Sequence, residues 1–429
     1  MPSTTVPTCR PVAGHWIAAL LCTFLYSLAA STAAQTPLTL VEAIDRTLNE
    51  NPQLAVFRFR DAALRGRTLS AAQRPPLRVR GELENLAGSS GAPDTELTVA
   101  LSSVIELGGQ RQARINAAQA NTDLLSIEEQ VQALDLLGEV IRRYVDVLAA
   151  VELVGLATDS AEIAREAVSA VNRRVKSAAA PQTELLRAEA ALAEARLTLQ
   201  AEGRKLEYHK RALAALWGAT SPEFNVDTRA LYRIEAGTDF SELYARAQEN
   251  PALARFASEE RLRAMEVRMR ETESNLDVGW AVGVRRFQTT DETTLVAAIE
   301  VPLFSARRNA GAVASARAEL ERIAADREVA RLRIYSHLYR AYSGREQAVA
   351  AVNSFDQHVI PALRAALQEA EKGYRRGRYP YLELVSARRE LMVAKRAKIE
   401  SAAAALRYGA EIEQLTAAPL LPAAGMTSK

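Results

Sequence analysis

The stretch from Leu77 to Glu84 is Leu-Arg-Val-Arg-Gly-Glu-Leu-Glu, in which apolar or small side chains alternate with charged ones. Strict alternation predicts a β-strand with one apolar face and one polar face. Three later segments alternate in the same way, at 97–102, 278–285 and 295–301. Together they predict two β-hairpins, over 77–105 and 278–303, whose loops are Gly-Ser-Ser-Gly at 88–91 and Gln-Thr-Thr-Asp at 288–291.

The apolar side of these strands needs a partner. Strands of about ten residues can cross a bilayer at a tilt. A soluble sheet with one buried face is the alternative, but the helices of this chain use their apolar faces on one another. We therefore predict that lipid covers the face that carries Leu77, Val79, Leu83, Leu97, Val99, Leu101, Val278, Trp280, Val282, Val284, Leu295, Ile299 and Val301.

Long helices make up most of the remaining chain. Residues 111–175 contain no proline, and a helix of this length would be a rod of about 100 Å. Its apolar side chains follow two seams at steps of three and four, which indicates neighbours on both sides. A break near 177–180 precedes a return helix that starts at Pro181. The second half repeats this pattern with a helix over 308–375 and a return helix from Pro380.

The chain is an internal duplication. Glu50-Asn51-Pro52 recurs as Glu249-Asn250-Pro251, and the prolines are 199 positions apart, as are Pro181 and Pro380. Each repeat is predicted to open with a capped helix, Thr39 and Asp239 being the caps and the first helix spanning about 39–73. The predicted segments are a first repeat over 35–218, a linker over 219–238, a second repeat over 239–416 and a flexible tail over 417–429.

The N-terminal 34 residues have the layout of a secretory signal peptide. They contain both cysteines, Cys9 and Cys22, so the exported chain has no thiolate for metal binding or catalysis. Leu21 before Cys22 fits lipoprotein processing poorly. The whole chain has 54 basic and 52 acidic residues, a balance that argues against a general nucleic-acid binder.

Four strands cannot cross a membrane alone, because their edges would leave unpaired backbone groups in hydrocarbon. Two chains would close eight strands into a barrel filled by its own side chains, whereas three would close twelve around an open lumen. The predicted fold is mainly α with a small β part. It is a long α-helical barrel continued by a transmembrane β-barrel, with four strands per chain shared in a trimer.

The mature chain resembles the TolC-like outer-membrane efflux proteins. The resemblance is carried by Glu50-Asn51-Pro52, by Glu106-Leu107-Gly108-Gly109-Gln110-Arg111, by Val301-Pro302-Leu303-Phe304 and by Tyr374-Arg375-Arg376-Gly377. The second and third of these look most like the cobalt–zinc–cadmium branch. The resemblance implies a homotrimer, a periplasmic adaptor at the helical tips and an inner-membrane RND-type pump.

The two breaks between long helices carry the candidate docking or gating residues. Basic side chains gather there, and the simplest reading is that they complement the helix dipoles. The alternative is an adaptor-docking or gate-latching collar. The tip residues are Arg174, Lys176, Pro181, Glu184, Tyr374, Arg375, Arg376, Gly377, Arg378, Pro380, Tyr381 and Glu383, with Arg173 and Lys372 beside them. When Arg174–Ser177 is set against Tyr374–Gly377, the first tip lacks the tyrosine and the turn glycine.

Other motifs argue against a catalytic or metal-binding role. The histidines of the mature chain, His209, His337 and His358, have no i, i+4 spacing, so no metal site or cofactor is expected. The polar strand face carries Glu82, Glu84 and Glu300 beside Arg78, Arg80 and Arg285, which favours a generic polar lumen. We therefore expect a passive channel that exports heavy-metal cations and is not an enzyme. The alternatives are a channel for drugs or small organic compounds and a soluble periplasmic coiled-coil adaptor.

Overall fold

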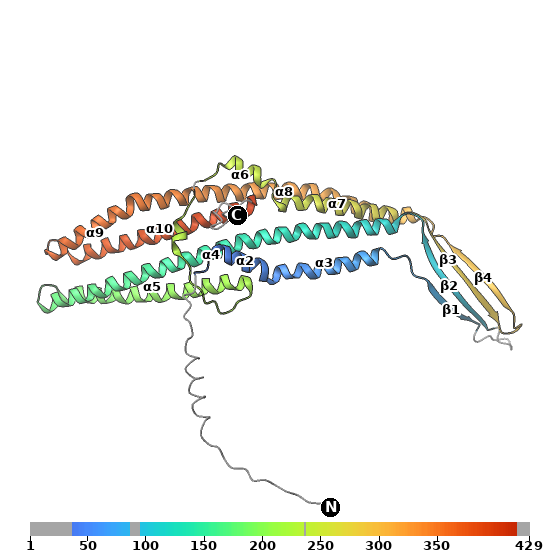
Figure 1. The fold of residues 1–429 in the computed structure, drawn as a ribbon, viewed down its shortest axis with the longest axis horizontal. Coiled ribbons are helices and arrows are strands. Elements are labelled where there is room, and N and C mark those ends of the chain that lie inside the picture. The colour runs from blue at the N-terminus through green and yellow to red at the C-terminus, as the bar shows by residue number, and fades with distance from the viewer. Residues whose placement is uncertain (1–36, 86–94, 236, 418–429) are drawn as a thin grey trace, which may run out of the picture.

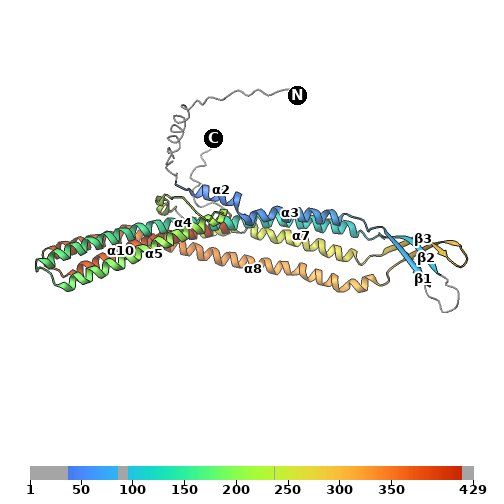
Figure 2. The ribbon, with the colours of Figure 1, turned by 90° about the horizontal axis from the view of Figure 1, so that it is seen from below.

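The computed structural model describes residues 37–85, 95–235 and 237–417. The signal-peptide prediction and the 88–91 loop lie outside these residues, as does the predicted tail except Ala417. The molecule is elongated, with a sheet at one end, the tips of two helical hairpins at the other, and short helices around its middle (Figures 1 and 2). The prediction of a mainly α chain with a small β part is confirmed.

Both repeats have the same order of elements. The first contains α2 (Leu40–Glu50), α3 (Pro52–Ala71), β1 (Arg78–Glu84), β2 (Glu96–Glu106), α4 (Gln110–Lys176) and α5 (Gln182–Ala214). The second contains α6 (Phe240–Ala247), α7 (Pro251–Thr272), β3 (Asp277–Phe287), β4 (Thr293–Glu300), α8 (Ser305–Ser354), α9 (Ile360–Arg375) and α10 (Tyr381–Thr416). A π-helical turn over Phe355–Val359 joins α8 to α9, so the long helix predicted over 308–375 is interrupted.

The helix predicted over 39–73 is two helices, because Asn51 stands before a proline. A residue in that position is pushed out of the helical region, and Asn51 has an extended backbone with φ −66° and ψ 124°. Its side chain caps α3 and also donates to the Leu216 carbonyl at 2.7 Å. Asn250 caps α7 in the same way and donates to the carbonyls of Gln414 and Leu415. The repeated Asn-Pro motif therefore fastens each opening helix to the end of the return helix.

The four strands form one antiparallel sheet in the order β1-β2-β3-β4. Two predicted strand residues lie just outside it, since Leu77 precedes β1 and Val301 follows β4. The two repeats meet at the β2–β3 pair, where Val99 is opposite Val284 and Leu101 is opposite Val282. The duplication thus produces a continuous four-stranded sheet rather than two separate hairpins.

The main hydrophobic core lies at the middle of the molecule. Val140, Val147 and Leu148 of α4 are buried there with alanines of α10. The segment predicted as a linker also contributes, because Leu231 is fully buried and Phe224 packs against Trp217. A 3₁₀ helix over Thr228–Tyr232 holds Leu231 in place. The segment between the repeats therefore contributes Phe224 and Leu231 to the core, a contribution that the absence of helical periodicity did not reveal.

Candidate functional site

One face of the sheet is apolar across all four strands. Residues opposite each other on antiparallel strands share a face, and the register aligns Val79, Leu101, Val282 and Ala297. The same face carries Gly81, Leu83, Leu97, Val99, Val278, Trp280, Val284, Leu295 and Ile299, together with the polar residues Ser103, Arg286 and Thr293. Val79 is 76% exposed and Leu295 is 82% exposed, so the described part of this chain leaves the face uncovered.

The opposite face of the sheet carries charges of both signs. Arg285 is paired with Glu96 at 3.1 Å and with Glu84 at 3.5 Å. Nearer the helices, Glu106 accepts from Arg114 at 2.5 Å. The carboxylates and arginines that the sequence places on the polar strand positions therefore do share one face.

The sheet has two open edges. β1 and β4 are its outer strands, and within the described residues neither pairs with another strand on its outer side. An open edge beside an exposed apolar face is a site for association with further strands. The geometry thus leaves both the edges and the apolar face available for partners.

The opposite end of the molecule holds two similar turns, one in each hairpin tip. In the first tip the amides of Ser177, Ala178 and Ala179 donate back to α4 carbonyls. In the second tip the amides of Arg376, Gly377 and Arg378 donate to α9 carbonyls. Each of these acceptors lies 199 positions after the corresponding acceptor of the first tip. Ala178 and Gly377 both have a left-handed backbone, with φ of 54° and 69°.

This equivalence corrects the predicted comparison of the tips by one residue. The counterpart of Gly377 is Ala178 rather than Ser177, and the counterpart of Tyr374 is Val175. The first tip does lack the glycine and the tyrosine. It nevertheless makes the same turn, and it does so with an alanine in a conformation that costs an L-residue about 1–2 kcal/mol.

Arg174 joins the two tips. Its guanidinium carbon lies 4.4 Å from the centroid of the Tyr374 ring. One nitrogen donates to the Tyr374 carbonyl at 3.1 Å, and the other donates to the Ala179 carbonyl at 3.2 Å. A cation over an aromatic ring is attracted by about 0.5–2 kcal/mol. The α4 end of the first hairpin is thereby fixed to α9 of the second.

Tyr374 also contacts the return helix of the first hairpin. Its hydroxyl donates to Glu184 at 3.1 Å, and its ring packs 5.7 Å from the ring of Tyr381. Burial, and then the hydrogen bond to Glu184, raise the pKa of Tyr374 to about 12. The hydroxyl is therefore protonated, and able to donate, across the physiological pH range.

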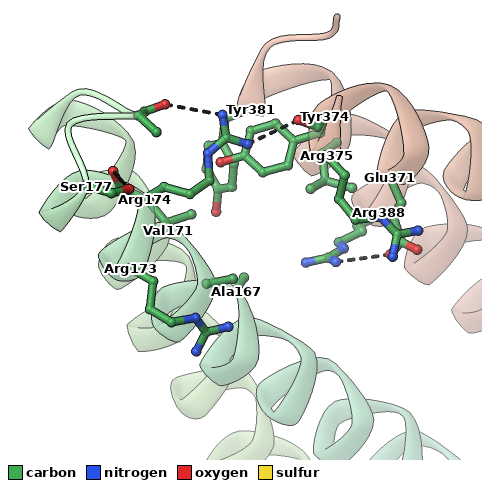
Figure 3. A pocket seen from close by; sticks show the side chains of 13 residues that line it. Ala167, Val171, Arg173, Arg174, Ser177, Glu371, Tyr374, Arg375, Tyr381 and Arg388 are labelled. Atoms are coloured by element: carbon green, nitrogen blue, oxygen red, sulfur yellow. Dashed lines mark hydrogen bonds and ion pairs between the residues drawn. The ribbon is translucent and has the colours of Figure 1, made fainter. Parts of the chain in front are cut away.

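A cavity of about 670 Å³ lies beside this contact. Figure 3 shows Arg174 reaching across it to Tyr374, with Arg173 further along α4 and Arg388 beside Glu371. Arg388 donates to Glu371 at 3.1 Å. Sequence reasoning missed Arg388 and Glu371, because they lie on helix faces several residues from the breaks.

The remaining predicted tip residues are at the tips but outside this contact. Pro181 and Pro380 cap α5 and α10 rather than forming their first turns. Lys176, Arg375, Arg376, Arg378 and Glu383 are exposed. The basic residues therefore do gather at one end of the molecule, where α4 and α9 end.

Within the described residues there is no group of three or more histidine, cysteine or acidic side chains that could hold a metal ion. In the same part of the chain, no helix combines the length and the apolar character needed to cross a membrane.

Known proteins resemble this chain in sequence and in fold. Residues 43–219 match the family described as outer membrane efflux protein. The cobalt-zinc-cadmium resistance protein CzcC of Cupriavidus metallidurans is 27% identical over 84% of this chain and 85% of that protein. The first repeat of the chain therefore belongs to the outer membrane efflux protein family. The predicted TolC-like family is thereby confirmed, and this protein is an efflux channel of the outer membrane.

Two other relatives of this outer membrane efflux protein differ in their described roles. The pyoverdine export outer membrane protein OpmQ of Pseudomonas putida is 26% identical over 76% of this chain and 72% of its own. The nickel-cobalt-cadmium resistance protein NccC of Alcaligenes xylosoxydans xylosoxydans is 24% identical over 64% of this chain and 61% of its own.

Solved structures agree on the fold of this efflux protein. The CusC crystal structure superposes with a TM-score of 0.74 at 15% identity, over 89% of this chain and 92% of CusC. The outer membrane protein VceC of Vibrio cholerae superposes with a TM-score of 0.69 at 17% identity, over 89% of this chain and 97% of VceC. These identities support the fold alone.

Proposed function

We propose that three copies of this chain form a passive conduit across the outer membrane. The observation that carries the proposal is the four-stranded sheet, which combines an exposed apolar face with two open edges. In hydrocarbon each unpaired backbone group costs several kcal/mol, so the edges need partners. Pairing β4 of one copy with β1 of the next closes twelve strands, with the apolar face toward lipid and the charged face toward the lumen.

The helical part then extends into the periplasm. α4 has 67 residues, which corresponds to about 100 Å. The same threefold arrangement surrounds a second lumen with the helices, and the tips become its periplasmic mouth. The conduit holds no energy source of its own, so an inner-membrane RND-type pump and a periplasmic adaptor would supply transport and docking.

Heavy-metal cations are the cargo that we propose. The support is that relatives spanning most or much of the chain are described as resistance proteins for cobalt, zinc, cadmium and nickel. A conduit does not need a metal site for this role, because tight binding would slow release. Small organic compounds are the second candidate, favoured by the pyoverdine exporter among the relatives.

Deletion of the gene tests the cargo. The deletion strain is grown over a range of cobalt, zinc and cadmium concentrations and, in parallel, over a range of organic biocides. We expect sensitivity to metals that a plasmid copy of the wild-type gene reverses. Sensitivity to organic compounds alone would replace metals with the second candidate.

A variant with an altered sheet separates transport from other effects of the gene. Val282→Arg, on the apolar face, is not expected to restore resistance, whereas Ala281→Arg, on the polar face of the same strand, is expected to do so. Equal restoration by both variants would contradict the sheet as a membrane element.

A further inference from the structure

The four connections between the helices and the sheet share a pattern of exposed apolar residues. They lie together where the helical part of the molecule meets the sheet (Figure 1). Each connection carries an exposed leucine, and these are Leu77 before β1 (65% exposed), Leu107 after β2 (66%), Leu276 before β3 (54%) and Leu303 after β4 (67%). Phe304, next to Leu303, is 77% exposed. We call these five residues the apolar border.

The apolar border continues the apolar face of the sheet. In β2 and β3, Ile105 is opposite Val278 on that face. The next step of the alternation toward the helices is Leu107 in one strand and Leu276 in the other. The leucines beside β1 and β4 keep the same even spacing from the face residues of their strands. The apolar face therefore extends past the ends of the strands as far as these connections.

Unpaired arginines stand on the helical side of the apolar border. They are exposed, and within residues 37–85, 95–235 and 237–417 none of them has an ion-pair partner; they are Arg74, Arg111, Arg307 and Arg308. Arg111 donates to the Ala72 carbonyl at 2.6 Å, and Arg308 donates to the Leu303 carbonyl at 2.8 Å. Carbonyl oxygens thus position two of the guanidinium groups without neutralising their charge.

The position of three of these arginines is unfavourable within the chain itself. Arg111 is the second residue of α4, and Arg307 and Arg308 lie within the first four residues of α8. A cation near the positive end of a helix dipole is destabilising, and neither helix has an acidic residue in its first turn to offset it. An anion from outside the chain would offset this cost.

We infer that the apolar border and its arginines bind acidic phospholipids of the membrane leaflet on the periplasmic side. The inference rests on the proposed function, which places the apolar face of the sheet in lipid. The leucines and Phe304 contact the acyl chains, and the arginines, a few ångströms further along the helices, form charge-assisted hydrogen bonds with the headgroup phosphates. A free anion would leave the leucines uncovered, and a zwitterionic headgroup would bring a second cation beside the arginines.

The test uses the purified full-length channel reconstituted in phosphatidylcholine bilayers. Phe304→Trp, made in a Trp280→Phe background, places a fluorescent indole at the apolar border, while the buried Trp217 gives a constant signal. Phosphatidylglycerol and phosphatidylcholine, each brominated on the acyl chains near the headgroup, are compared as quenchers. We expect the phosphatidylglycerol to be preferred beside the indole about fivefold, the factor expected for one arginine near an anionic headgroup.

Variants of the arginines locate the preference. Arg307→Gln/Arg308→Gln should quench equally with both lipids, and Arg307→Lys/Arg308→Lys should retain part of the preference because it keeps the charge. Arg333→Gln is the matched control, since it removes an exposed arginine of α8 that lies about 40 Å further from the sheet. It should retain the full preference. The oligomeric mass of each variant in detergent shows whether it has folded.

Four results would overturn the inference. Equal quenching by the two lipids with all arginines present is the first, and an unchanged preference in the double glutamine variant is the second. The third is loss of the preference when inorganic phosphate is added at constant ionic strength, which would indicate a site for a free anion. The fourth is an indole that neither lipid quenches, which would mean that another copy of the chain or a partner covers the border.

Trp280 keeps the failure of this inference distinct from the failure of the proposed function. It lies on the apolar face of β3, and the difference between wild type and Trp280→Phe isolates its fluorescence. Quenching of Trp280 by brominated lipid together with no preference at the border would leave the membrane position of the sheet intact and overturn the lipid site alone. Absence of Trp280 quenching would contradict the proposed function itself.

Discussion

The two hairpin tips lie side by side and share a backbone turn, yet they differ in side chains. Ala178 takes the left-handed conformation in the first tip, and Gly377 takes it in the second. Arg174 of the first tip corresponds to Gly373 of the second, where a side chain would meet the Tyr379 ring at 2.1 Å. The first tip therefore supplies the arginine, and the second supplies the tyrosine that it contacts.

This difference shows how a duplicated chain gains a contact that neither repeat could make with an identical copy. Two arginines at equivalent positions would repel, and two tyrosines would lack the cation. After the duplication, the backbone turn could stay the same while the side chains diverged into complementary partners.

Gly377→Val should have the largest effect on the tips. The left-handed conformation costs an L-residue about 1–2 kcal/mol, and a β-branched side chain fits it worst. We expect a distorted second tip and reduced export, with the oligomer intact. Gly311→Val is the control, since this glycine in α8 also has open space around it but no positive φ. Full export by Gly377→Val would show that export does not depend on the left-handed turn at Gly377.

Arg174→Ala should loosen the contact between the tips by about 1–2 kcal/mol, since it removes the cation over the ring and two hydrogen bonds. A double-mutant cycle with Tyr374→Leu, monitored by thermal unfolding, should give a coupling energy of about 1 kcal/mol. Arg173→Ala is a matched control that leaves the Tyr374 ring covered. Additive effects of the two changes would show that the arginine and the tyrosine do not act as a pair.

Ala178→Gly should stabilise the first tip. Relief of the left-handed strain is offset by the greater freedom of glycine in the unfolded chain, so the net gain should be about 0.5–1 kcal/mol. Slower hydrogen exchange of the amides of Ser177 and Ala179 would measure it. Faster exchange would mean that the alanine is not strained there.

The smallest effect concerns pH. Because the pKa of Tyr374 is raised to about 12, above the usual value of 10.0, its contribution to stability is fully present below pH 10. It should decline as the pH rises from about 10 to about 12. The absorbance of tyrosinate, measured as the difference between wild type and Tyr374→Phe, reports this titration. A midpoint near 10 would show that the residue is not buried against Glu184.

Most of the fold could be predicted from two sequence patterns, the alternation of side chains within the strands and the repetition of motifs between the two halves. The register that unites Val79, Leu101 and Val282 follows from period-two patterning, because it gathers most of the apolar strand residues on one face. The length of α4 followed from the absence of proline over 111–175. Local patterns were sufficient in both cases because the signal extends over many residues.

Tertiary contacts decided what the sequence did not reveal. The break at Asn51 depends on one residue before a proline, and its benefit comes from a carbonyl 165 positions away. The packing of Leu231 and the turn at Ala178 have no periodicity to indicate them. The sequence predicted that the tip residues lie at the ends of the helical hairpins. It could not predict that Arg174 pairs with Tyr374, because this contact depends on how the two hairpins lie relative to each other.

The central claim is that the sheet lies in the outer membrane with its apolar face toward lipid. Oligomeric mass in mild detergent, measured on outer-membrane fractions, tests it with Val282→Arg and Ala281→Arg, which put the same side chain on opposite faces of β3. We predict trimers for wild type and Ala281→Arg, and a strongly reduced trimer yield for Val282→Arg, since arginine facing lipid at mid-membrane costs about 2–4 kcal/mol. Equal trimer yields for the two variants, or a soluble wild-type monomer in the periplasm, would contradict the account.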